Sequence, residues 1–234
     1  MSWLWEYYNQ IIAAVVYYAA VIAIAVPLTI RWRGPYVLIS LYIASYVICQ
    51  YLSPKLTVFT LMKGISWIVP GGNVPFVATV AIMDLIVVSW GLKLARQVIV
   101  AGFLTQVMLY LANALTYLTP DPFPGFEWKS YVYLTSARVA IASPIAYLIA
   151  ELINAYLTWI FRGIPWKRTV YSDPIALTVD TLIFTPIAFY GVVSLDVLME
   201  MIVGLSIIKV MLIPLNLLVI YVNRVLVEPR LVAA

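Results

Sequence analysis

The chain has 234 residues, of which 65% are hydrophobic and 10% are charged, and its mean hydropathy is +1.01. Soluble domains carry about 25% charged residues, so this chain lacks the polar side chains that cover a water-soluble globule, and it is too apolar to be disordered. The composition therefore predicts an integral membrane protein. With 14 basic and 10 acidic residues in total, the place of each charge relative to the membrane becomes the main question.

The residue inventory excludes several kinds of chemistry. Histidine is absent and Cys49 is the only cysteine. This excludes catalysis by Ser-His-Asp or Cys-His groups, His-ligated metals, an intrachain disulfide and cysteine clusters for zinc or iron–sulfur. Cys49 is interpreted as a small apolar helix residue. The sequence also lacks the glycine-rich phosphate-binding patterns, so we expect no cofactor, no metal and no enzymatic activity.

Seven apolar stretches of 17 to 26 residues follow one another along the chain. Each has the length of a membrane-spanning helix, roughly 17–25 residues, and continuous apolar runs are unlike the alternating segments of a β-barrel. We predict an all-α, polytopic helix bundle that forms one transmembrane domain over residues 1–234. Its spans are residues 11–30, 36–52, 74–90, 97–118, 138–161, 174–193 and 197–222.

The basic residues predict the orientation of this bundle. Cytoplasmic loops carry an excess of Lys and Arg, and seven spans place nine basic residues on one side and three on the other. We therefore expect a plasma-membrane protein with its N-terminus outside and its C-terminus in the cytoplasm. Six spans are the alternative, if residues 36–52 or 74–90 are re-entrant, and would scramble this bias. The scatter of basic residues over short loops also argues against nucleic acid as a partner. The richer side has Arg31, Arg33, Lys93, Arg96, Arg162, Lys167, Arg168, Arg224 and Arg230, and the poorer side has Lys55, Lys63 and Lys129.

The segment between the second and third stretches, residues 53–73, is long and fairly apolar. We expect it to lie along the outer membrane interface or to enter the membrane as a partial helix. Pro70, Gly71 and Gly72 would end any helix there.

Four ionisable residues lie well inside the apolar stretches: Asp84, Glu151, Asp180 and Lys209. A charge at the bilayer centre costs about 2.5–3.5 kcal/mol on insertion scales, so these side chains are expected to face inward, to pair, or to line a wet cavity. Lys209 and Asp180 could form a structural ion pair. Asp84 and Glu151 have no obvious cationic partner, and are expected to be protonated or to bind a ligand that has hydrogen-bond donors.

Helical spacing places polar side chains on shared faces. Tyr147, Glu151 and Asn154 lie three or four residues apart in the fifth stretch, and Lys209 and Asn216 lie seven apart in the seventh. Residues at these spacings share one helix face. We therefore predict a polar site between the third, fifth, sixth and seventh spans, at midmembrane depth, where transporters bind their substrates.

Four ordered stretches carry a family resemblance. They are VPGG at 69–72 with Asp84 and WGLKLAR at 90–96; ARVAIAS at 137–143 with Tyr147, Glu151 and Asn154; DTLIF at 180–184 with IAFYG at 187–191; and Lys209 in its apolar surroundings. In order and spacing they resemble the queuosine-precursor transporter family, also known as the vitamin uptake transporter family. The acid and the amide at positions 151 and 154 look exchanged relative to the family pattern.

The resemblance implies a six-span core, to which residues 11–30 add an N-terminal helix, and uptake of a 7-deazaguanine such as 7-cyano-7-deazaguanine for tRNA modification. A guanine-like edge presents adjacent N–H donors, which one carboxylate can accept, and a carbonyl, which a cation can contact. We expect Glu151 or Asp180 to read the donors and Lys209 or Arg138 to contact the carbonyl, with Asp84 in support or coupled to a proton. The candidate substrate-binding residues are Asp84, Arg138, Tyr147, Glu151, Asn154, Asp180, Lys209 and Asn216.

Two other functions stay open. An S-component, the substrate-capture subunit of energy-coupling factor transporters, is also a small multi-span bundle that binds a vitamin, but it works with an ATPase and a coupling subunit. Such a subunit docks through small residues, and the alanines between residues 13 and 25 fit this as well as they fit helix packing. An intramembrane enzyme would need a carboxylate pair such as Asp84 with Asp180. A homodimer also stays open.

Overall fold

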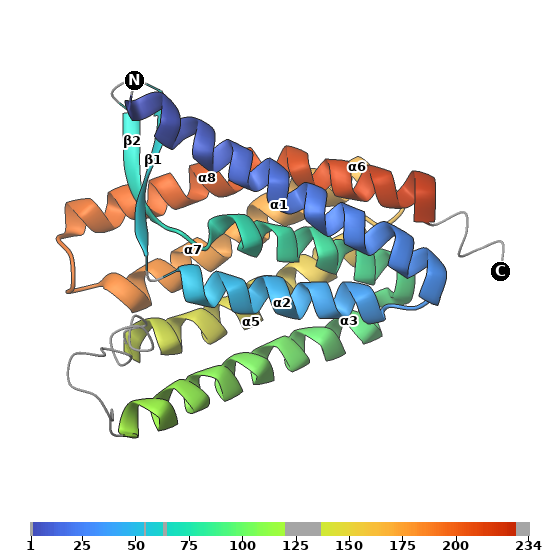
Figure 1. Cartoon of the computed structure of the whole chain (residues 1–234), viewed down its shortest axis with the longest axis horizontal. Helices are drawn as coiled ribbons and strands as arrows, with labels where there is room; N and C mark the ends of the chain where they lie inside the picture. The colour runs from blue at the N-terminus through green and yellow to red at the C-terminus, as the bar shows by residue number, and fades with distance from the viewer. Residues whose placement is uncertain (1, 54, 63–64, 120–136, 228–234) are drawn as a thin grey trace.

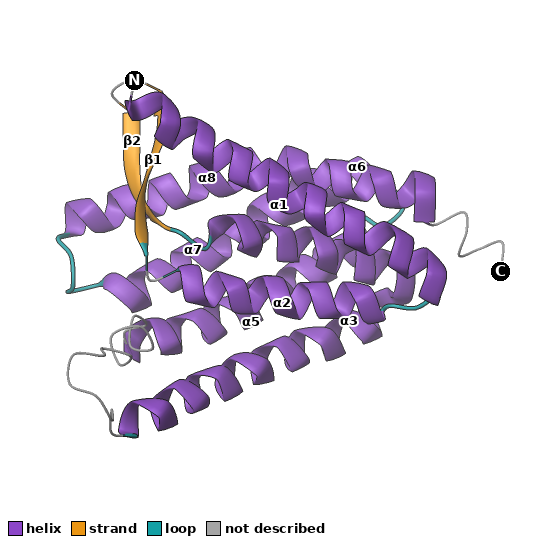
Figure 2. Cartoon of the chain, in the orientation of Figure 1, coloured by secondary structure: helices purple, strands orange, loops and turns teal. Residues whose placement is uncertain are grey.

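The computed structural model describes residues 2–53, 55–62, 65–119 and 137–227. Long helices dominate it and lie side by side as a bundle (Figures 1 and 2). They are α1 (Ser2–Trp32), α2 (Tyr36–Leu52), α3 (Asn73–Leu118), α5 (Ala137–Ile160), α7 (Asp173–Phe189) and α8 (Leu195–Val222). A short helix, α6 (Pro165–Lys167), and a π-helical turn, η1 (Arg168–Ser172), lead into α7, and a second π-helical turn, η2 (Asn223–Val227), follows α8.

The helix α3 consists of two arms that meet at Gly91. This residue has φ 85° and ψ 169°, a backbone conformation that essentially only glycine adopts without strain. Figure 1 shows the second arm running back along the bundle from this point. The two arms therefore correspond to two of the predicted stretches, residues 74–90 and 97–118.

Within the described residues, four helices are long and apolar enough to cross a membrane by length and composition. They cover Ile12–Trp32, Asn73–Thr116, Arg138–Ile160 and Leu195–Val227, and Tyr36–Leu52 is a shorter apolar helix. The predicted helical membrane bundle is confirmed at this level, and the number of seven spans stays a prediction. Lys63, Lys129 and Arg230, which enter the predicted charge bias, lie outside the described residues.

Of the two predictions for residues 53–73, the partial helix is wrong, and the position along the outer membrane interface stays a prediction. This segment forms an antiparallel hairpin of β1 (Leu56–Met62) and β2 (Ile65–Pro70), in which Phe59 lies opposite Trp67. Its β-branched and aromatic residues favour strands. The buried side chains of Phe59 and Val69 pack with Leu205 of α8, so the hairpin is fixed to the bundle and the fold is not purely α-helical.

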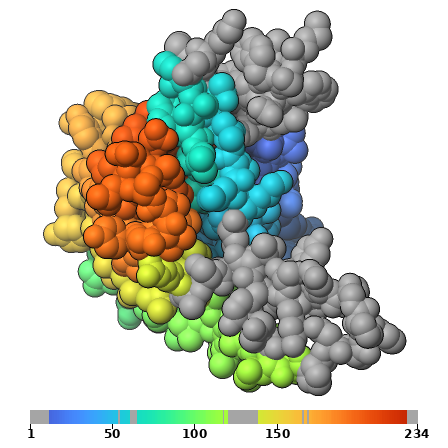
Figure 3. All heavy atoms as spheres, turned by 90° about the vertical axis from the view of Figure 1, so that its left-hand side faces the viewer, coloured from blue at the N-terminus to red at the C-terminus, as the bar shows by residue number. Residues whose placement is uncertain are grey.

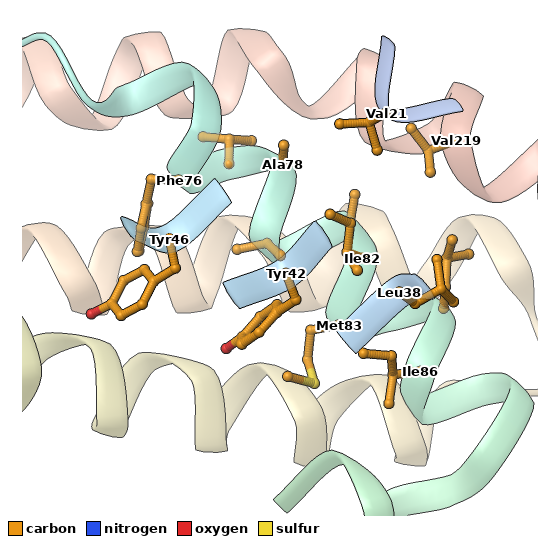
Figure 4. Packing of buried hydrophobic residues seen from close by; sticks show 14 of the residues in the cluster. Val21, Leu38, Tyr42, Tyr46, Phe76, Ala78, Ile82, Met83, Ile86 and Val219 are labelled. Atoms are coloured by element: carbon orange, nitrogen blue, oxygen red, sulfur yellow. The ribbon is translucent and has the colours of Figure 1, made fainter. Parts of the chain in front are cut away.

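The first arm of α3 forms the centre of the core. Ile82, Met83 and Ile86 are 1%, 0% and 0% exposed, and they pack against Leu38 and Tyr42 of α2 (Figure 4). Large apolar side chains on the outer faces of the other helices are exposed, as expected for surfaces that contact lipid. At one end of the bundle, the hairpin, the beginning of α8 and the beginning of α5 gather on one face (Figure 3).

Candidate functional site

A buried ion pair joins α7 and α8. Lys209 Nζ lies 2.6 Å from Asp180 Oδ2 and 2.9 Å from Thr181 Oγ1, and 4.8 Å from the centroid of the Phe76 ring. Lys209 is 3% exposed and Asp180 is 7% exposed. Charges this deeply buried are stable only when paired and hydrogen-bonded, and the pair that the sequence left open is indeed formed.

The ion pair lies in a narrow cleft near the base of the hairpin. The cleft is lined by residues of α2, α3, α5, α7 and α8, and its free volume of about 30 Å³ has room for only a few water molecules. Lys209 and Asp180 share its wall with the aromatic rings of Phe76 and Phe184. Such rings provide faces on which a flat heterocycle can stack, but the helices must move apart before one can enter.

The amide side chains of Gln50 and Asn73 also line the cleft. Gln50 Nε2 donates to Ser143 Oγ at 2.8 Å, and the Tyr110 hydroxyl donates to Gln50 Oε1 at 2.7 Å. Asn73 Nδ2 donates to the backbone oxygen of Pro70 at 2.7 Å. An amide has both donors and acceptors, so these groups can match a mixed polar edge of a ligand.

Sequence reasoning missed these lining residues. Gln50 carried a usable signal, because it is the only amide or charged side chain within residues 36–52. Ser143 and Phe184 lie inside the motifs ARVAIAS and DTLIF that carried the family resemblance. Nothing in the sequence singled out Phe76.

Glu151 and Tyr147 lie together in the core between α2, α3 and α5, outside the lining of the cleft. Glu151 is 1% exposed, and its Oε1 lies 3.4 Å from the Thr79 hydroxyl, which makes its shorter hydrogen bond, 2.6 Å, to the Phe76 carbonyl. The Tyr147 hydroxyl lies 2.6 Å from that of Tyr42, and its ring stacks on Tyr46 with centroids 4.1 Å apart. Tyr147 is therefore already engaged in helix packing.

Asp84 and Asn154 belong to a third group, farther from the hairpin. Asn154 Nδ2 and Thr158 Oγ1 donate to Asp84 Oδ1 at 3.1 and 2.7 Å. The Ser172 hydroxyl donates to Asn154 Oδ1 at 2.5 Å. All four side chains are fully buried, so α3, α5 and the turn before α7 share one polar network.

Asp173 extends this network and was not predicted, because it lies one residue before the predicted stretch 174–193. It begins α7 with Pro174 in the first turn, a position that suits proline. Asn216 Nδ2 donates to Asp173 Oδ2 at 2.7 Å, and the Tyr18 hydroxyl donates to Asn216 Oδ1 at 2.6 Å. The buried carboxyl groups of Asp84 and Asp173 also interact electrostatically with each other.

The helices α7 and α8 thus carry two polar contacts in register. Moving seven residues back from Asp180 reaches Asp173, and moving seven forward from Lys209 reaches Asn216. Seven residues of helix span about 10 Å. A displacement of α7 along α8 would therefore change both contacts together.

Arg138 lies away from the cleft. Its side chain is exposed, and its guanidinium donates to the backbone oxygen of Tyr190, just after α7. Of the eight predicted site residues, the cleft lining brings together Asp180 and Lys209.

Comparison with known proteins gives two matches. Residues 70–223 match a family described as "Putative vitamin uptake transporter". A relative from Haemophilus influenzae, named "Probable queuosine precursor transporter", is 29% identical over 139 residues, and the alignment covers 58% of this chain and 58% of the relative. No solved structure matches. The matched family region contains the ion pair and the buried carboxyl groups, and α1 and α2 precede it.

Proposed function

The chain belongs to the vitamin uptake transporter family, a multi-pass membrane family, and on this premise we propose that it carries a 7-deazapurine precursor of queuosine across the membrane. The name of the Haemophilus influenzae relative supports this substrate class. A compound such as 7-cyano-7-deazaguanine is the substrate that we expect.

The Asp180–Lys209 pair in the cleft is the observation on which this proposal depends. A guanine-like edge has adjacent N–H donors beside a carbonyl, and the pair presents a carboxylate beside an ammonium. The substrate would therefore insert between Asp180 and Lys209 and exchange one set of charge-assisted contacts for another. The rings of Phe76 and Phe184 would cover its faces.

The position of the cleft supports uptake from outside. Pro70 and Gly72 at the base of the hairpin line the cleft, and the predicted charge bias puts the hairpin end outside. Seven spans, with the C-terminus in the cytoplasm, fit the two arms of α3 and the five other long helices. The closed cleft then represents one state of an alternating cycle.

Equilibrium binding of 7-cyano-7-deazaguanine to the purified full-length chain tests the role of Asp180. Asp180→Asn keeps the size of the side chain and removes its charge. A hydrogen bond to a charged group contributes about 1.5–3 kcal/mol, so we expect the Kd to rise by roughly 10- to 100-fold. Asp196→Asn is the matched control, because Asp196 is exposed at the beginning of α8, and it should bind like the wild type.

Unchanged affinity in Asp180→Asn would contradict this site. Glu151→Gln then tests the other carboxylate that the sequence analysis proposed. A loss of affinity in that variant alone would mean that Glu151, and not Asp180, accepts the N–H donors of the substrate. Substrate uptake by vesicles that contain this chain alone distinguishes a carrier from a capture subunit, which needs an ATPase partner.

A further inference from the structure

Buried carboxyl groups continue inward from the cleft along the first arm of α3. Phe76 lines the cleft, Thr79 contacts Glu151, and Asp84 joins the inner network. At 1.5 Å per residue, Thr79 and Asp84 lie about 4.5 and 12 Å from Phe76 along the helix axis. The Glu151 carboxyl group interacts electrostatically with both Asp84 and Asp180, so it links the inner pair to the cleft.

The interacting Asp84 and Asp173 carboxyl groups at the inner end favour the binding of one proton, because both are fully buried. Asn154 and Thr158 occupy Asp84 Oδ1, and Asn216 occupies Asp173 Oδ2. Ionised carboxylates have only acceptors, so two carboxyl groups form a hydrogen bond only when one of them is protonated. Both residues are 0% exposed, and two adjacent buried anions would cost far more free energy than one shared proton.

Glu151 gives an independent sign that this region binds something. Within the described residues its Oε2 has no hydrogen-bond partner, and the residue is 1% exposed. No lysine or arginine among those residues forms an ion pair with it, because Lys209 is held by Asp180 and Thr181. A buried acceptor of this kind is costly, unless it receives a proton during function.

The groups that contact the carboxyl pair or interact electrostatically with it are neutral or acidic. They are Tyr18 of α1, Asn154, Thr158 and Glu151 of α5, and Asn216 of α8.

We propose that the Asp84–Asp173 carboxyl pair binds the proton that drives substrate uptake, with Glu151 as the relay between the pair and the cleft, so that the carrier is a proton symporter. This inference rests on the proposed function. One proton binds the pair from outside, converting a carboxylate to a carboxylic acid, and leaves on the cytoplasmic side. Asp180 and Asp173 lie two turns apart on α7. A displacement of α7 along α8 would therefore change substrate binding at Asp180 and proton binding at Asp173 together.

Liposomes that contain the full-length chain test this with labelled 7-cyano-7-deazaguanine. Exchange of label at equal pH on both sides measures binding and turnover without net proton movement. Net uptake is then measured with the outside more acidic and the membrane potential held at zero. One proton per neutral substrate predicts about tenfold accumulation per pH unit in the wild type.

Asp173→Asn is the decisive variant. The amide that it introduces can still hydrogen-bond to Asp84, so we expect exchange to be retained and the accumulation to be lost. Asp196→Asn removes an exposed carboxyl group at the beginning of α8 and should accumulate substrate like the wild type.

The outcomes separate the two proposals. Absence of exchange in the folded wild type would overturn the proposed function and this inference with it. Exchange without proton-driven accumulation in the wild type would overturn the inference alone. Accumulation by Asp173→Asn at the wild-type level would also overturn the inference. Loss of exchange in folded Asp173→Asn would overturn it as well, because the carboxyl pair would then have a structural role.

Discussion

The substitution Lys209→Met tests how much the buried ion pair stabilises the bundle. It keeps most of the apolar stem and removes the ammonium group, which contacts Asp180 at 2.6 Å, Thr181 at 2.9 Å and the Phe76 ring at 4.8 Å. Asp180, 7% exposed, is then left without its cation. Removing one partner of a buried ion pair costs about 3–5 kcal/mol, and we expect a loss of free energy of unfolding in this range. Thr181 is less affected, because its hydroxyl also donates to the Leu177 carbonyl at 2.9 Å.

A double-mutant cycle isolates the pair itself. Asp180→Asn combined with Lys209→Met removes both charges, so the double variant should recover much of the stability that Lys209→Met loses. We expect a coupling energy of about 2 kcal/mol or more, well above the average of about 0.6 kcal/mol for hydrogen bonds between membrane helices. Unfolding by a denaturing detergent in mixed micelles, followed by tryptophan fluorescence, measures all four free energies.

The reasoning fails if Lys209→Met unfolds with the same free energy as the wild type. It also fails if the double variant loses the sum of the unfolding free energies that the two single variants lose. Additive losses would mean that Asp180 and Lys209 do not stabilise each other. The exposed substitution Asp196→Asn provides the baseline for a charge change that breaks no buried pair.

Three further substitutions test the account, each compared with the exposed control Gly163→Ala, whose added methyl group meets no atom within 4 Å. Gly91→Ala should destabilise the protein by about 1–3 kcal/mol, because φ is +85° at the turn between the arms of α3; a melting temperature equal to the control would refute this. Gly204→Ala should displace the hairpin and lower the melting temperature, because its Cβ would lie 2.3 Å from Trp67 Cβ; unchanged melting would mean that the hairpin does not pack on α8. Tyr147→Phe should cost about 1–3 kcal/mol of stability and leave the Kd for 7-cyano-7-deazaguanine unchanged; a weakened Kd in a folded variant would bring Tyr147 back into the site.

The helices were predictable because membrane spans follow from run length and apolar composition. The predicted stretch 36–52 coincides with α2, and 197–222 differs from α8 only by two residues at its start. The stretch 174–193 ends later than α7, because the chain leaves the helix after Phe189 and turns at Gly191 with φ 75°. Local turn geometry of this kind leaves only a weak trace in hydropathy.

The hairpin could not be recognised from hydropathy because both of its strands contain apolar residues on both faces. Phe59 and Val69 are buried against α8, and Val58 and Ile68 are exposed. Strict alternation of apolar and polar residues is the usual strand signal, and it is missing here. The partner surface on α8 becomes visible only in three dimensions.

The candidate site was predictable where a buried charge restricts the possible partners of a side chain. Lys209 has few partners at its depth, so its pairing with Asp180 could be foreseen. Asp173 and Gln50 escaped because their importance depends on contacts across the bundle, to Asn216 and to Ser143. Sequence spacing shows which residues share a helix face, and it does not show which faces meet.

Counterflow uptake by liposomes that contain only the purified chain tests the central claim most directly. Vesicles loaded with unlabelled 7-cyano-7-deazaguanine should take up the labelled compound, and a related 7-deazaguanine should compete while an unrelated vitamin should not. Asp180→Asn should strongly reduce the uptake at low substrate concentration, and Asp196→Asn should preserve it. Folded wild-type protein that takes up no label, or that does so only with an added ATPase module, would contradict the account of this chain as a self-sufficient carrier.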